Sequence, residues 1–234
     1  MERVKSGIPG LDDLVEGGFP KGASILVSGG AGTCKTIIGM QFIYNGAMDY
    51  GEPGLYVTVE TNLKNIVWNM EGFNWDIRKL QEKNLMRVYR LQFDVTKDLA
   101  EQISVQLDTI TSIVKQMKAK RLVIDSTTAF GIWIDDMGKL RNTLFTFTDA
   151  IKDLGCTTLL TAETKGGKMD FSAFGIEEFI TDGVIALYFT PPNRSIFIRK
   201  MRGTAHSKRI HPFEITKKGV EVKSKDELIW EAIK

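Results

Sequence analysis

The sequence has 234 residues, a length that suits one large α/β domain and leaves little room for two. It carries 31 Lys and Arg against 29 Asp and Glu, and the net charge of +2 argues neither for nor against nucleic acid, although proteins that coat DNA are usually more basic. No apolar run approaches the roughly 20 residues that span a bilayer. Residues 1–7 contain no apolar segment of a secretory signal, so we expect a cytoplasmic protein with no membrane partner. Its two cysteines, Cys34 and Cys156, are too few for a disulfide framework.

Short β-branched runs alternate with amphipathic segments along most of the chain. The predicted strands are 24–28, 55–59, 86–89, 121–125 and 157–162, and the predicted helices are 36–50, 63–70, 98–118 and 139–154. After residue 183 the pattern changes to strands joined by short turns, at 184–189, 195–200 and 213–215. We therefore predict a single α/β domain over residues 1–234. Its mostly parallel twisted sheet has helices on both faces and a C-terminal antiparallel hairpin extension.

Three acidic residues follow predicted strands of this sheet. Glu60, Asp125 and Glu163 each stand at or just past a strand's carboxyl end. Ligands of such sheets bind at those ends, so we expect the three acids to gather on one functional rim.

Residues 29–36, hereafter the phosphate loop, fit the pattern G-x-x-x-x-G-K-[ST] between a strand and a helix, except that Cys34 replaces the last glycine. Backbone N–H groups of such a loop cradle phosphate oxygens, Lys35 reaches the β- and γ-phosphates, and the Thr36 hydroxyl is a magnesium ligand. The alternative is a glycine-rich turn without a ligand. The predicted nucleotide-binding residues are Gly29, Gly30, Ala31, Gly32, Thr33, Cys34, Lys35, Thr36 and Ile37.

Asp125 ends an apolar strand, which is the Walker B pattern for an acid that holds magnesium directly or through water. Alone this pattern is weak evidence, because buried strands often end in an Asp that caps a helix. It becomes strong evidence in combination with the phosphate loop upstream. Glu60 ends the strand that follows the phosphate-loop helix, where a carboxylate can orient or deprotonate an attacking water. The alternative for Glu60 is a solvated loop acid.

Lys200 and Arg202 alternate on a predicted strand and so share one face, where two cations can bind phosphate. Spacing alone favours a solvated edge strand. His206 follows them, and no second ligand lies at metal spacing from it.

Several segments together resemble the KaiC-like branch of the RecA family, over nearly the whole chain. They are residues 6–14, 17–22, 56–60, 174–183, 200–206 and 211–215. The resemblance is to single-domain archaeal members of the branch, and it implies a RecA-like fold that binds ATP and magnesium.

The resemblance also implies a ring, expected to be a hexamer, with ATP between subunits. Lys35, Thr36, Glu60 and Asp125 would come from one subunit, and Lys200 and Arg202 would reach across from the next to stabilise γ-phosphate charge. Glu163 stands where RecA-type proteins place a polar residue that senses the γ-phosphate. His206, which ends the segment 200–206, is included among the nucleotide-binding residues.

The sequence departs from the family pattern at three places. Cys34 replaces the loop glycine, Thr61 follows Glu60 where KaiC-like proteins have a second glutamate, and the phosphoacceptor pair of KaiC falls on Glu178 and Phe179. We therefore expect slow ATP hydrolysis and no KaiC-type autophosphorylation, and a single domain gives no reason to infer a clock role.

Three alternatives remain open at the sequence level. The first is a nucleotide-binding scaffold with little hydrolysis, caused by Cys34. The second is a redox role for Cys34, whose thiol at a helix N-terminus can have a lowered pKa. The third is an accessory protein that binds single-stranded DNA, like the RadA paralogues, through residues 164–171 with their two lysines and Phe171. The sequence does not identify a protein partner.

Overall fold

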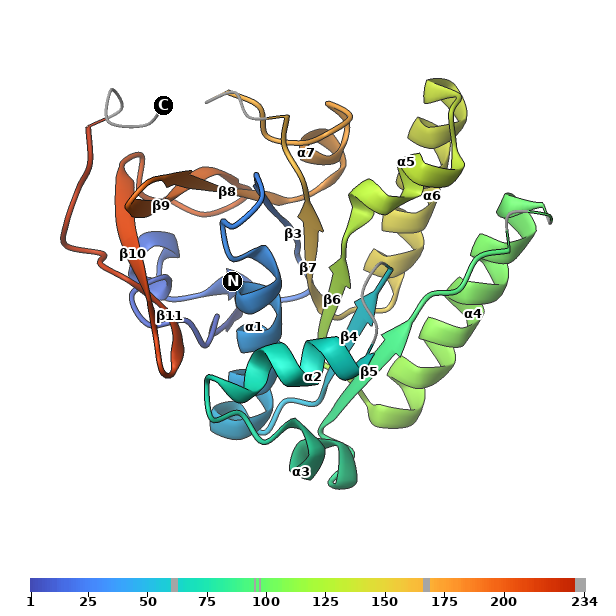
Figure 1. Cartoon of the computed structure of the whole chain (residues 1–234), viewed down its shortest axis with the longest axis horizontal. Helices are drawn as coiled ribbons and strands as arrows, with labels where there is room; N and C mark the ends of the chain where they lie inside the picture. The colour runs from blue at the N-terminus through green and yellow to red at the C-terminus, as the bar shows by residue number, and fades with distance from the viewer. Residues whose placement is uncertain (60–62, 95, 97, 166–168, 230–234) are drawn as a thin grey trace.

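The computed structural model describes residues 1–59, 63–94, 96, 98–165 and 169–229. Its main feature is a nine-stranded sheet in the order β11-β10-β9-β8-β3-β7-β6-β4-β5 (Figure 1). The strands are β3 (Ser24–Gly29), β4 (Gly54–Thr58), β5 (Met86–Arg90), β6 (Arg121–Asp125), β7 (Thr157–Ala162), β8 (Gly183–Thr190), β9 (Asn193–Met201), β10 (Ile210–Thr216) and β11 (Gly219–Val222). Two short strands, β1 (Arg3–Val4) and β2 (Phe19–Pro20), pair with each other.

The sheet has a parallel part and an antiparallel extension. Strand β3 pairs in parallel with both β7 and β8, and the parallel pairing continues through β6 and β4 to β5. From β8 outward, β9, β10 and β11 pair antiparallel. The phosphate loop thus leaves a central strand of the sheet, at the carboxyl edge that also carries the ends of β6 and β7.

Helices cover both faces of the sheet, because the apolar residues of each central strand alternate between two cores. Ile25 and Val27 of β3 belong to the core under α1 (Lys35–Tyr50), whereas Leu26 belongs to the core under α4 (Leu99–Met117) and α6 (Met137–Asp153). Figure 1 shows α1 and α2 (Leu63–Glu71) on one side and α4 and α6 on the other. The smaller helices are η1 (Asp12–Val15), α3 (Ile77–Glu82), η2 (Thr127–Ala129), α5 (Phe130–Trp133) and α7 (Glu177–Ile180).

Helix α1 is anchored near its C-terminal end by Arg121, the first residue of β6. The Arg121 side chain is fully buried, forms a 2.6 Å ion pair with Glu52 and donates from Nη1 to the Phe42 carbonyl at 2.9 Å. Its guanidinium also lies 4.6 Å from the Phe42 ring centroid. A side chain at Gly46 would collide with Arg121, since an added Cβ would come within 2.3 Å of it, so a glycine in mid-helix makes room for the cation.

The predicted fold class is confirmed, including the helices on both faces and the antiparallel C-terminal strands. Most predicted elements agree with the structure to within one to three residues at their ends. Strand β8 was predicted only as part of the C-terminal hairpin. It also pairs in parallel with β3, so it connects the parallel part of the sheet to the antiparallel strand β9. Within the part of the chain that the structure describes, no helix is both long enough and apolar enough to cross a bilayer.

Candidate nucleotide site

The phosphate loop connects β3 to α1 and is held by its own side chains. Thr33 Oγ1 donates to the Gly30 carbonyl at 2.8 Å, and Lys35 Nζ donates to the carbonyls of Gly29 and Gly30 at 2.7 and 2.9 Å. The loop's N–H groups and Lys35 therefore share one small region at the start of α1, which is the arrangement that binds phosphates.

Cys34 has a backbone conformation that favours glycine. Its φ is 75°, in the left-handed region, and it immediately precedes the first residue of α1. The loop pattern has a glycine at this position because glycine adopts a positive φ without steric strain. Cys34 adopts the same backbone angle at a cost in conformational energy.

The thiol of Cys34 is half-buried and lines the pocket beside the loop. Burial raises the pKa of this thiol above its ordinary value of 9.0, although Arg194 and Lys35 act to lower it. The hypothesis of a thiol activated by a lowered pKa is therefore wrong, because desolvation of the thiolate outweighs the nearby cations.

Asp125, at the end of β6, is held by three hydroxyl groups. Thr36 Oγ1 donates to Asp125 Oδ2 at 2.9 Å, the Tyr56 hydroxyl donates to the same oxygen, and Thr161 Oγ1 donates to Oδ1. The two residues predicted to hold magnesium are thus in direct contact. Tyr56 and Thr161 belong to β4 and β7, the two neighbours of β6, so the sheet itself positions the carboxylate.

Tyr56 was not predicted as a site residue. Its side chain is fully buried, and burial together with the Asp125 charge raises the pKa of its hydroxyl well above its ordinary value, so it remains a donor. The sequence does carry a signal, because a tyrosine in an otherwise aliphatic buried strand needs a partner for its hydroxyl.

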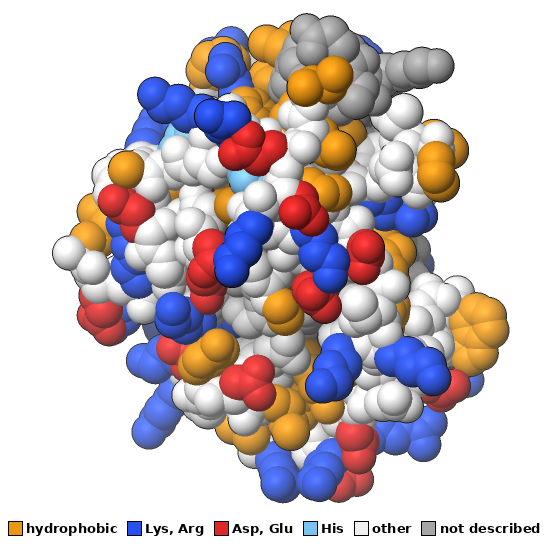
Figure 2. All heavy atoms as spheres, turned by 90° about the vertical axis from the view of Figure 1, so that its left-hand side faces the viewer, with side chains coloured by type: hydrophobic (Ala, Val, Ile, Leu, Met, Phe, Trp, Pro, Cys, Tyr) orange, Lys and Arg blue, Asp and Glu red, His pale blue; other side chains and the backbone are white. Residues whose placement is uncertain are grey.

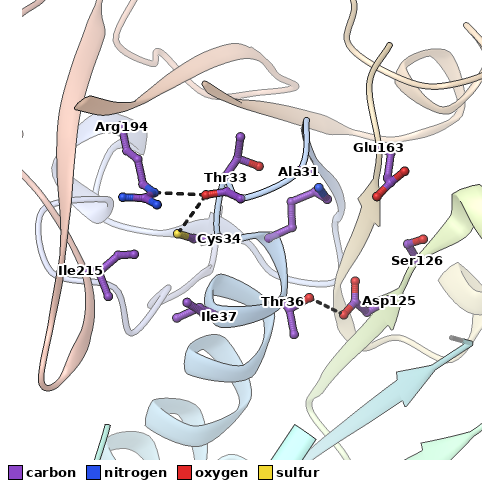
Figure 3. A pocket seen from close by; sticks show the side chains of 12 residues that line it. Ala31, Thr33, Cys34, Thr36, Ile37, Asp125, Ser126, Glu163, Arg194 and Ile215 are labelled. Atoms are coloured by element: carbon purple, nitrogen blue, oxygen red, sulfur yellow. Dashed lines mark hydrogen bonds between the residues drawn. The ribbon is translucent and has the colours of Figure 1, made fainter. Parts of the chain in front are cut away.

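A pocket of about 500 Å³ lies over the phosphate loop and extends to the ends of β6 and β7. In Figure 3, Thr36, Asp125, Ser126 and Glu163 lie at one end of it, and Cys34, Ile37, Arg194 and Ile215 lie at the other. Glu163 is exposed at the pocket, and its backbone N–H binds Thr128 Oγ1 at 2.8 Å. The predicted residues Ala31 to Ile37, Asp125 and Glu163 are thus brought together on one rim. Arg194 and Ile215, which were not predicted, join them from the hairpin strands.

The residues around Thr36 have the chemistry that magnesium requires. Thr36 Oγ1 and Asp125 Oδ2 are both oxygen donors, which Mg²⁺ prefers, and one carboxylate beside a phosphate loop is a common protein contribution to a magnesium–nucleotide site. Among the described residues there is no cluster of three or more His, Cys, Asp or Glu side chains that would make an all-protein metal cage. The donor set therefore fits magnesium held jointly with phosphates.

Lys200 and Arg202 lie at the opposite edge of the sheet. Lys200 pairs with Val184, and the next residue, Met201, pairs with Gly183 beside Ile25, near the start of β3. The phosphate loop leaves the other end of β3. A single chain therefore does not bring these two cations to its own phosphate loop.

Both cations are held by the segment that precedes β8. Lys200 Nζ donates to the carbonyls of Glu178 and Thr181 at 2.9 and 2.6 Å, and Arg202 Nη1 lies 3.2 Å from Asp182 Oδ1. Burial and the nearby Arg202 lower the pKa of Lys200. Of the two, Arg202 is the more exposed, so it is the readier to reach another molecule.

His206 follows this pair on the same edge. It is half-buried, and its Nδ1 lies 2.9 Å from the Ser207 carbonyl. Like Lys200 and Arg202, it is absent from the residues that line the pocket over its own phosphate loop.

Glu60 lies outside the described residues. The chain is described up to Val59, whose N–H donates to the Asp125 carbonyl at 2.9 Å. The role predicted for Glu60 stays a prediction.

The candidate DNA-binding segment 164–171 does not expose its aromatic residue, Phe171, for stacking on a base. Its residues 166–168 lie outside the described residues. Phe171 is 7 % exposed and lies under the Arg199 guanidinium, 5.1 Å from ring centroid to cation, so it does not offer a face for base stacking. On the face shown in Figure 2, positive and negative side chains are interspersed and form no continuous basic patch over the described residues.

A family model described as "ATPase: KaiC" matches residues 4–227. The chain belongs to the KaiC-like ATPase family. That membership supports nucleotide binding and ATPase activity. This KaiC-like chain is 36 % identical to a UPF0273 protein of Methanocaldococcus jannaschii over 237 aligned residues, which cover 95 % of this chain and 96 % of that protein.

Its fold also matches a solved KaiC-like structure. The crystal structure of a KaiC-like protein from Pyrococcus horikoshii OT3 superposes with a TM-score of 0.85 at 40 % identity and covers 94 % of this chain and 98 % of that one. The circadian clock oscillator protein KaiC of Parathermosynechococcus lividus is 35 % identical over 231 residues, 95 % of this chain but 42 % of KaiC. The KaiC-like chain thus spans less than half of the clock protein.

Proposed function

We propose that this protein is a magnesium-dependent ATPase with slow turnover, formed by one RecA-like domain over residues 1–234 and working in the cytoplasm. The observation that carries the proposal is the hydrogen bond between Thr36, at the end of the phosphate loop, and Asp125, at the end of β6. It joins the phosphate-binding element to the acid of a Walker B strand inside a pocket of suitable size.

Each residue of the pocket has a role in this proposal. Backbone N–H groups of residues 29–36 bind the phosphate oxygens, and Lys35 exchanges its loop carbonyls for the β- and γ-phosphates. Thr36 and Asp125 hold magnesium, which when bound neutralises charge on the phosphates. Glu163, on the same rim, contacts the region of the γ-phosphate and senses its presence.

Glu60 is proposed to orient and deprotonate the attacking water, and its position after β4, the strand next to β6, supports this. A single glutamate and a strained phosphate loop are the reasons to expect slow turnover. The test is ATP hydrolysis measured as phosphate release with Glu60→Gln. The variant should bind ATP as the wild type does and lose most of its turnover. Turnover equal to that of the wild type would overturn the role of Glu60.

We further propose that the complete site forms between two copies of the chain in a ring, with a hexamer expected. Lys200 and Arg202 of one copy would reach the γ-phosphate at the neighbour's phosphate loop, and His206 would contribute to the same contact. The position of all three at the edge of the sheet opposite the loop supports this assignment. Size measurement in solution with and without ATP tests it, since a monomer at all concentrations would exclude a composite site.

A second candidate is a nucleotide-binding scaffold with negligible hydrolysis. The observation that favours it is the left-handed backbone of Cys34 within the loop. If this candidate holds, Cys34→Gly should raise turnover well above the wild type while ATP affinity stays similar. An unchanged turnover would remove Cys34 as the cause of slow hydrolysis. The alternative of single-stranded DNA binding is weakened because Phe171 is buried and offers no face for base stacking. If the protein does not bind single-stranded DNA at low salt, this alternative is excluded.

A further inference from the structure

We propose that the tip of the β8–β9 hairpin, residues 189–194, clasps the phosphate loop, with Arg194 as the positioning residue of the nucleotide site. Arg194 Nε donates to the Gly32 carbonyl at 3.1 Å, across 162 positions of sequence. Figure 3 shows the Arg194 side chain pointing from the hairpin toward the loop, on the side of the pocket away from Asp125. The inference rests on the proposed ATP site and assigns a residue that acts on it from another part of the chain.

The bond from Arg194 fixes the direction of a loop amide. The peptide between Gly32 and Thr33 is planar and trans, so its carbonyl and its N–H point in opposite directions. By holding the Gly32 carbonyl, Arg194 sets where the Thr33 N–H points. Gly32 has a φ of 75° and no side chain that restricts its backbone, so a contact from outside the loop helps to hold this peptide in place.

The Arg194 side chain is itself held in place by Phe189, its direct partner across the hairpin. The guanidinium carbon lies 4.2 Å from the Phe189 ring centroid, within the range of a favourable cation–π contact. The same ring packs against the loop, since a Cβ on Gly32 would lie 3.6 Å from it. Ring, cation and loop therefore form one stack, and the guanidinium adds a positive charge beside the phosphate-binding amides.

The register of the sheet makes this clasp possible. Leu187 of β8 pairs with Gly29, the last residue of β3, so the hairpin extends past the strand end at the same edge where the phosphate loop begins. An added Cβ on Gly29 would lie 2.6 Å from the Leu187 carbonyl, which shows how closely the two segments approach.

The test compares Arg194→Ala and Arg194→Lys with Arg199→Ala. Arg199 is a matched control, because it lies on the same strand and also stacks on a phenylalanine but does not line the pocket. In nucleotide-free protein, amide hydrogen exchange over residues 29–35 should accelerate in Arg194→Ala and stay unchanged in Arg199→Ala. Arg194→Lys should recover part of the protection, because its ammonium can reach a carbonyl but lacks the planar stack.

Binding supplies the second measurement. In Arg194→Ala the affinities for ATP, GTP and inorganic tripolyphosphate should fall by the same factor, about tenfold for one charge-assisted hydrogen bond.

Two results would overturn the assignment. Loss confined to ATP and GTP, with tripolyphosphate unaffected, would mean that Arg194 contacts the base and not the loop. Unchanged hydrogen exchange in Arg194→Ala would mean that the loop needs no clasp. If the wild-type protein bound neither ATP nor tripolyphosphate, the proposed function would fail, whereas the exchange comparison would still decide the role of Arg194.

Discussion

Thr36 and Asp125 stand 89 positions apart in the sequence, and a 2.9 Å hydrogen bond joins their side chains. This contact places the first turn of α1 against the end of β6. Because Tyr56 and Thr161 also donate to Asp125, the carboxylate is oriented before any ligand arrives. Preorganisation of this kind lowers the ordering cost of binding a cation.

Removal of the Thr36 hydroxyl should weaken the binding of magnesium. Thr36→Val keeps the size of the side chain but loses the oxygen, so the magnesium concentration needed for half-maximal ATP binding should rise by roughly tenfold or more. Thr36→Ser is the control, since it keeps the hydroxyl, and it should stay near the wild type. The measurement is ATP affinity titrated against Mg²⁺. Equal curves for the three proteins would contradict the assigned ligand.

Mixed subunits should reveal whether Lys200 and Arg202 act on a neighbour. The double variant Lys200→Ala with Arg202→Ala should bind ATP but not hydrolyse it, and Lys35→Ala should fail to bind. In a mixture of the two, some sites combine an intact phosphate loop with intact cations from the next copy. Phosphate release should therefore reappear on mixing. A mixture as inactive as its components would place the two cations outside the site.

Cys34→Gly should stabilise the nucleotide-free protein. A non-glycine residue at positive φ costs of order 1–2 kcal/mol, and the extra freedom of glycine in the unfolded chain returns part of that. The free energy of unfolding should rise by about 0.5–1 kcal/mol, measured by denaturant unfolding. Cys34→Ala keeps the Cβ and should not gain. If both variants behave alike, backbone strain at this position is not the cause.

Cys34 should react slowly with alkylating reagents at neutral pH. Burial raises the pKa of its thiol above 9.0, so the thiolate fraction is small near pH 7 and keeps growing as the pH passes 9. ATP should slow the reaction further, because the thiol lines the pocket. Burial raises the pKa of Cys156 to about 11, so Cys34→Ala measures the background. A rate that levels off below pH 8 would contradict the raised pKa.

Glu52→Ala should be strongly destabilising. It removes the carboxylate partner of Arg121, a cation with no exposed side-chain surface, whereas Glu52 itself is 30 % exposed. The expected loss in free energy of unfolding is about 3 kcal/mol, near the lower end for one partner of a buried ion pair. The exposed pair of Lys21 and Glu2 provides the comparison, and Glu2→Ala should change stability by less than about 1 kcal/mol. Similar effects of the two substitutions would contradict the importance of burial.

The sequence was sufficient to predict the parts of the site that are formed by residues close together in the chain. Strand, loop and helix follow one another through Lys35 and Thr36, and Asp125 ends a strand whose apolar run is plain in the sequence. Cys34 could be recognised as a departure, and its positive φ supplies the physical reason why glycine is usual there. The alternative of a lowered thiol pKa fails, because the degree of burial that raises this pKa depends on packing that no local sequence pattern reports.

Residues positioned by strand register were beyond sequence reasoning. Arg194 reaches the phosphate loop only because β8 pairs with β3 and the hairpin then turns back at the carboxyl edge. Tyr56 reaches Asp125 only because β4 and β6 are neighbours in the sheet. Strand β11, with four residues, and α7, also with four, are too short for their periodicity to be read.

Strand β6 touches helix α1 at both ends of the strand. Its first residue, Arg121, binds the Phe42 carbonyl, and its last residue, Asp125, binds Thr36. Strand and helix are therefore tied together at both ends of β6 and form one unit. Any movement that nucleotide exchange requires must then occur outside this unit. Among the described segments, the loop before α1 and the hairpin above it lie outside this unit, and we expect the movement there.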